Sequence, residues 1–122
     1  MKKMIKRKNF EKFVEKVTVV IEDQDKRIGA LYDSIQTLEG DEDFHSELLK
    51  GIDEILSEKA DKLKEAILTA LIIYSDLRQK ELLSNEEVEA YTISVGNVID
   101  YQTKLCGLLM TKLDILETTI NK

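Results

Sequence analysis

The residues with the most versatile chemistry are one histidine and one cysteine, His45 and Cys106. Glu42 and His45 have the Glu-x-x-His spacing of a di-iron half-site, but that site needs a second such motif and the chain has no second histidine. The same count excludes a zinc site and, with no serine motif around His45, a Ser-His-Asp site. Lys104 alone is weak support for a reactive thiolate at Cys106. We therefore expect no metal, no cofactor and no enzymatic activity, and we interpret Cys106 as a buried hydrophobic residue.

Acidic side chains gather between Glu39 and Asp61, where nine acidic residues accompany two basic ones. The order Gly40-Asp41-Glu42-Asp43 lacks the alternation of an EF-hand loop, which favours helix capping over calcium binding. Such a run usually forms a solvated face; the alternative is that it docks on a basic surface of another protein. The acidic residues proposed for that contact are Glu39, Asp41, Glu42, Asp43, Glu47, Asp53 and Glu54.

Basic side chains gather at the other place that could attract a partner, the N-terminal arm of residues 1–8. Residues 1–16 carry a net charge of +5, whereas residues 17–122 carry −11. An anionic partner would contact the five basic residues of the arm, which are Lys2, Lys3, Lys6, Arg7 and Lys8. No interleaved aromatic pattern for base stacking accompanies them, and the acidic body repels a phosphate backbone. Nucleic-acid binding is therefore an alternative to protein binding rather than the first expectation.

The elements that must position these side chains are helices. The chain of 122 residues has no proline and only five glycines, too few for the tight turns of a sandwich or barrel. Its length is that of one domain. No apolar run approaches the roughly 20 residues of a membrane span, and one cysteine cannot form an internal disulfide. We expect a cytoplasmic protein with no membrane span.

Apolar residues recur at alternating steps of three and four over three segments, which predicts three amphipathic helices and no convincing strand. The first helix covers about 9–39, and Gln24 is the one polar residue in its stripe, as in a register-setting core position or a helix–helix contact. The second covers about 42–82 and is apolar on all sides near Leu68, Ile72 and Ile73, which predicts burial or a protein-binding surface there.

The third helix covers about 85–121, and its start is marked by a capping box formed by Ser84 and Glu87. Glycines within the helices leave the number of helices open. Gly51 could split the second helix, and Gly96 could break or kink the third or mark a close helix contact, so four helices are the alternative. The predicted fold is all-α: an elongated antiparallel bundle forming one domain over residues 9–122.

Three functional hypotheses remain after these exclusions. The first is a non-enzymatic protein-binding module, such as an inhibitor, immunity protein, chaperone or adaptor, that uses the acidic residues together with Leu68, Ile72 and Ile73. The second is a nucleic-acid accessory protein that uses the basic arm. The third is a structural coiled-coil subunit of a homo-oligomer, because a slender bundle leaves apolar surface uncovered.

Overall fold

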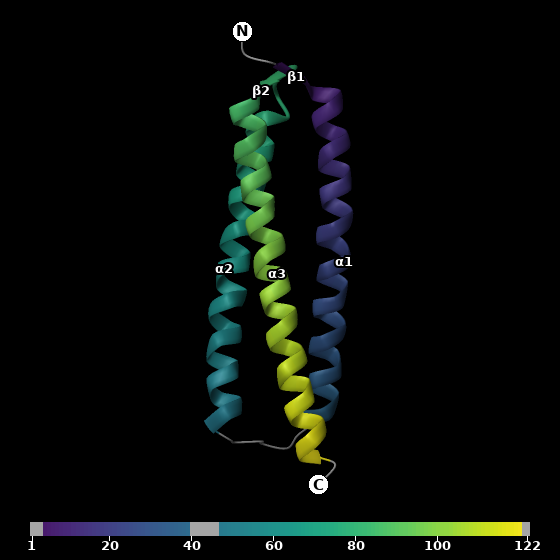
Figure 1. Ribbon diagram of the computed structural model, residues 1–122, viewed down its shortest axis with the longest axis vertical. Helices are drawn as coiled ribbons and strands as arrows, with labels where there is room; N and C mark the ends of the chain where they lie inside the picture. Colours follow the sequence, from purple (N-terminus) through teal and green to yellow (C-terminus); the bar gives the residue numbers. More distant parts are fainter. Residues whose placement is uncertain (1–3, 40–46, 121–122) are drawn as a thin grey trace.

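The computed structural model of the protein describes residues 4–39 and 47–120, where the chain forms three long helices and two short strands. β1 (Met4–Lys6) leads into α1 (Arg7–Glu39); α2 (Glu47–Leu77) runs back; and β2 (Leu82–Ser84) precedes α3 (Asn85–Ile120). Figure 1 shows the helices side by side in alternating directions, forming a rod. The predicted elongated, antiparallel, all-α bundle is confirmed.

The glycines do not divide the helices. α2 continues through Gly51 and α3 continues through Gly96, so the bundle has three helices in the described part of the chain rather than four. A Cβ atom added at either glycine would meet nothing within 4 Å. Neither glycine therefore marks a close approach of two helices.

The expectation that the chain forms no strand was wrong. β1 and β2 pair antiparallel at one end of the rod, with Ile5 opposite Leu83 (Figure 1). α2 accordingly ends at Leu77 instead of near residue 82, and the Arg7 amide donates to the Glu81 carbonyl at 2.9 Å. Strands of three residues are too short to show a period of two in the sequence. They tie the start of α1 to the α2–α3 connection, and Leu83 of β2 is fully buried.

The core follows α3, which packs along both other helices, whereas α1 and α2 approach each other less closely than either approaches α3. An aromatic cluster joins all three helices near the strands: the Phe10 ring lies 5.1 Å from Tyr91 and 6.2 Å from Tyr74, centroid to centroid. Further along the rod the core is aliphatic, with Ile28, Leu63 and Leu105 buried, while Val14 is half-buried. Gln24 is a helix–helix contact, since its Oε1 accepts from the Thr103 hydroxyl of α3 at 3.4 Å.

Candidate protein-binding groove

An apolar groove of about 430 Å³ opens between α1 and α2. It arises where the heptad stripe of α2 changes from large to small, because Ala70 stands between Leu63 and Leu77 one heptad away on either side. The short Ala70 side chain does not fill the space between α2 and α1 at this point of the rod. As a result, Val14 and Ile21 of α1 stay half-buried. The groove is lined by Val14, Thr18, Ile21 and Glu22 of α1, by Ile67, Ala70, Leu71 and Tyr74 of α2, and by Tyr91, Val95 and Val98 of α3.

Polar contacts join α1 to α2 on both sides of this opening. Toward the strands, the Tyr74 hydroxyl donates to the Glu11 carboxylate at 3.0 Å; burial and then this carboxylate raise the Tyr74 pKa. Toward the other end of the rod, Lys112 of α3 reaches a carboxylate on each neighbouring helix, with Nζ 2.7 Å from Glu39 and 2.7 Å from Asp53. The groove therefore lies between two polar bridges, in a stretch where α3 alone holds the outer helices together.

A buried glutamine lies close to the groove. Gln102 is 1% exposed and lies one helical turn beyond Val98, and its Nε2 donates to the Ile21 carbonyl at 3.0 Å. Its Oε1 has no hydrogen-bond partner. An unpaired buried carbonyl costs free energy, so Gln102 is a weak point beside an already open section of the bundle.

Exposed apolar side chains continue the groove onto the outer side of α2. Leu71 lines the groove and is 56% exposed, and Leu68 and Ile72 beside it are 60% and 69% exposed. We call these three residues the α2 patch. Leu68 and Ile72, which the sequence analysis proposed for partner binding, are therefore exposed, whereas Ile73 packs partly against the core.

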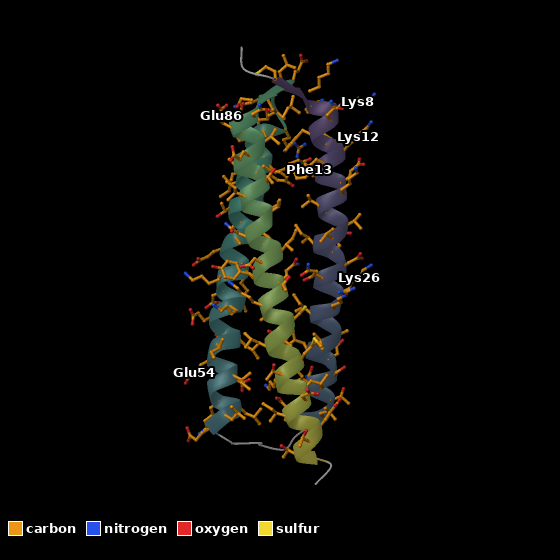
Figure 2. All side chains as sticks on the ribbon, in the orientation of Figure 1. Lys8, Lys12, Phe13, Lys26, Glu54 and Glu86 are labelled. Atoms are coloured by element: carbon orange, nitrogen blue, oxygen red, sulfur yellow. The ribbon has the colours of Figure 1, made fainter. Side chains whose placement is uncertain are left out.

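The predicted acidic docking residues are not one uniform surface. Glu39 and Asp53 bind the buried Lys112 at the edge of the core, and this contact gives them a structural role. Burial on its own lowers the Lys112 pKa, but its hydrogen bonds to Asp53 and Glu39 outweigh burial and raise it overall. Glu47 and Glu54 are exposed, and Figure 2 shows Glu54 pointing outward from α2. Asp41, Glu42, Asp43 and the neighbouring His45 lie outside the described residues.

The basic residues lie at the end of the rod that carries the strands. Lys6 belongs to β1, Arg7 and Lys8 begin α1, and Lys2 and Lys3 lie outside the described residues. Residues 4–8 of the predicted arm therefore belong to β1 and to the start of α1. Arg7 Nη1 donates to the Arg78 carbonyl at 3.2 Å. In Figure 2, Lys8 and Lys12 point away from the bundle, while Phe13 points inward.

The sequence analysis missed the α1 and α3 walls of the groove. Val14, Val95 and Val98 fall on the apolar stripes, and a stripe does not reveal whether the facing helix reaches it. The one usable signal was Ala70 at a position where the neighbouring heptads carry leucine.

Other sites receive no support from the described residues. Residues 4–39 and 47–120 contain no group of three or more His, Cys, Asp or Glu side chains placed to hold a metal ion. Cys106 is half-buried, and burial raises the pKa of its thiol despite the opposing charge of Arg27. Among the described helices, none combines the length and the apolar character needed to traverse a bilayer. Comparison of the chain with protein-family models, curated proteins and solved structures gives no match.

Proposed function

We propose that this protein is a non-enzymatic, cytoplasmic protein-binding module that acts as an inhibitor, immunity protein, chaperone or adaptor. One observation carries the proposal: Leu71 both lines the apolar groove between α1 and α2 and belongs to the exposed α2 patch. Burying a large aliphatic side chain stabilises a complex by roughly 1.5–3 kcal/mol when burial is complete. A partner that covers the patch and enters the groove gains this free energy from several side chains at once.

The test is a photo-crosslinking experiment in the cells from which the gene comes. A photoreactive amino acid is introduced in place of Leu71, where it should contact the partner. In a second protein, the matched control, the same amino acid replaces Ile93. Ile93 is 59% exposed, like Leu71, but lies outside the residues that line the groove. We expect protein adducts at position 71 that position 93 does not give.

A second arm of the experiment ties the adducts to the patch. Leu68→Glu with Ile72→Glu should remove the adducts at position 71 without loss of helical circular dichroism, because both side chains already face water. The control pair, Ile93→Glu with Met110→Glu, changes two α3 side chains that are each 59% exposed. If position 71 gives no more adducts than position 93, the proposed function is wrong.

Nucleic-acid binding is retained as a second candidate because the basic residues converge. Lys6, Arg7, Lys8 and Lys12 line one shallow cavity at the strand end, where Glu11, Glu15 and Glu81 also lie. Binding of DNA or RNA through these residues would weaken steeply with salt. A filter-binding titration at low and physiological salt, repeated with Lys8→Gln and Lys12→Gln, measures this directly. Absence of binding by the intact chain at low salt would eliminate the candidate.

A further inference from the structure

The α1 edge of the groove carries a row of four carboxylates with Thr18 at its middle position. Glu11, Glu15, Thr18, Glu22 and Asp25 follow one another at steps of four, three, four and three, which places them along one side of the helix. Thr18 and Glu22 line the groove, and Glu11 hydrogen-bonds to Tyr74, which also lines it. Thr18 and Glu22 place the row beside the groove along α1, whereas Glu11 and Glu15 also line the neighbouring cavity together with Lys8 and Lys12. We call this row the acidic edge.

The α2 edge differs from the α1 edge. The corresponding row on α2 runs through Lys64, Ile67, Leu71, Tyr74 and Arg78, so it contains no carboxylate and is uncharged between its two end residues. Ile67, Leu71 and Tyr74 line the groove. Anything that fills the groove therefore meets negative charge on one side only, and apolar side chains from α2 and α3 elsewhere.

The shape of the opening calls for a helix. α3 packs on both outer helices and these approach each other less closely, which is the arrangement of a four-helix bundle with one corner empty. Beyond the Glu11–Tyr74 hydrogen bond, the acidic edge covers residues 15–25, a length of about 15 Å at 1.5 Å per residue. A partner helix therefore needs about three turns in contact with this edge.

We infer that the groove binds an amphipathic helix of a partner protein, apolar on the face that enters the groove and carrying Lys or Arg along the side that lies against α1. This inference rests on the proposed function, because it specifies the partner surface that the protein-binding module recognises. The partner helix completes the fourth corner of the bundle, and its basic side chains pair with Glu15, Glu22 and Asp25. A second copy of this chain fits less well, since residues 17–122 of each copy carry −11 and would repel.

The test uses synthetic helices as probes. A fluorescent, helix-stabilised 16-residue peptide carries Leu at its apolar positions and Lys along one side, and a matched peptide has Glu in place of every Lys. Fluorescence anisotropy is measured at low and physiological salt. We expect the Lys peptide to bind at least about tenfold more tightly than the Glu peptide at low salt, and this ratio to shrink as salt rises.

Two variants of the protein locate the binding. Glu22→Lys with Asp25→Lys should weaken the Lys peptide and strengthen the Glu peptide, while Asp23→Lys with Glu54→Lys makes the same change in net charge away from the groove and should preserve the preference for the Lys peptide. Ala70→Leu fills the groove from below and should abolish binding of the Lys peptide. Thermal unfolding of each variant shows whether it still folds. If Ala70→Leu is unstable, Leu71→Glu replaces it, because that side chain is already 56% exposed.

Each outcome separates this inference from the proposed function. Equal affinity for the two peptides, or Lys-peptide binding that survives both the charge reversal and the groove variant, overturns the inference. If photo-crosslinking at position 71 captures a partner while the Lys peptide does not bind, the protein-binding module stands and the basic-helix inference fails. If light scattering shows a dimer that Leu71→Glu dissociates, the groove is filled by a second copy, which also overturns the inference.

Discussion

At the scale of single residues, Lys112 connects the three helices. Its side chain occupies the buried stripe of α3 between Leu109 and Leu116, and its ammonium group reaches Glu39 of α1 and Asp53 of α2. The two carboxylates are partly exposed, whereas Lys112 is 8% exposed. The aliphatic stem thus fills core space while the charged group pairs at the edge of the core.

We predict that Lys112→Met lowers the free energy of unfolding by about 1–3 kcal/mol, because two carboxylates then face each other without a cation. Urea denaturation at pH 7 measures the change. The matched control is Lys104→Met, which removes an exposed ion pair with Asp100 from the same helix and should cost no more than about 0.5 kcal/mol. Equal costs for the two variants would show that Lys112 makes no special contribution.

The pKa of Lys112 determines how its contribution to the free energy of unfolding changes with pH. Its pKa is raised in the folded state, so the pairing stabilises the fold fully below the ordinary lysine pKa of 10.5. The stabilisation is lost as the pH rises through the higher, folded-state pKa. The difference between the wild-type protein and Lys112→Met should therefore shrink in strongly alkaline solution.

These single residues were the least predictable part of the molecule. Lys112 and Gln102 occupy buried positions, but apolar periodicity alone does not show whether a polar residue on a stripe is buried. Ala70 falls on the apolar stripe of α2 like its neighbours, although its small size is what opens the groove. Periodicity reports which face a residue is on, and it carries no information on whether the facing helix fills the remaining space.

At the scale of elements, the start of α3 shows how local sequence fixes a boundary. The Ser84 amide donates to Glu87 Oε1 at 3.0 Å, and the Glu87 amide donates to Ser84 Oγ at 3.1 Å, as the capping box predicted. Glu87 also pairs with Lys80. The Lys80 hydrogen bond, followed by the Ser84 amide, lowers the Glu87 pKa to about 2.

We predict that Glu87→Gln is destabilising at pH 6 and becomes progressively less so in acid. A carboxyl group whose pKa falls from 4.5 to about 2 on folding stabilises the fold above pH 4.5, and this stabilisation is lost as the pH falls toward 2. Urea denaturation of both proteins at several values between pH 2 and pH 6 gives the curve. Glu89→Gln, an exposed change in the same helix, is the control; a pH-independent gap for Glu87→Gln would contradict the prediction.

The elements divide clearly into those that the sequence predicts and those that it does not. The three helices and the capping box follow from side-chain periodicity and local hydrogen bonding, which act over a few residues. β1 and β2 depend on pairing between residues about 80 positions apart, such as Ile5 with Leu83. Nothing within either three-residue segment encodes that pairing, so the early end of α2 at Leu77 could not be anticipated.

At the scale of the whole molecule, α3 holds the bundle together and the outer helices depend on it. α1 is covered unevenly: Ile28 and Ile35 are buried toward one end, whereas Val14, Val17 and Ile21 are only half-buried beside the groove. Stability within a domain follows the density of buried contacts. Local unfolding of α1 should therefore require the least free energy in the section beside the groove.

We predict that native-state hydrogen exchange divides α1 into two parts. Amides of residues 14–25 should exchange faster than those of residues 28–35, and the slowest amides should belong to α3 around Val98, Leu105 and Leu109, which are 0–2% exposed. Exchange measured by mass spectrometry or NMR at neutral pH resolves these segments. The comparison within one helix is its own control, since sequence-dependent intrinsic rates can be corrected. Uniform protection along α1 would contradict the prediction, because it would mean that the groove does not lower the local stability of the helix. Faster exchange beside the groove that is suppressed by the Lys peptide would instead show that a helix in the empty corner supplies the packing that α1 lacks.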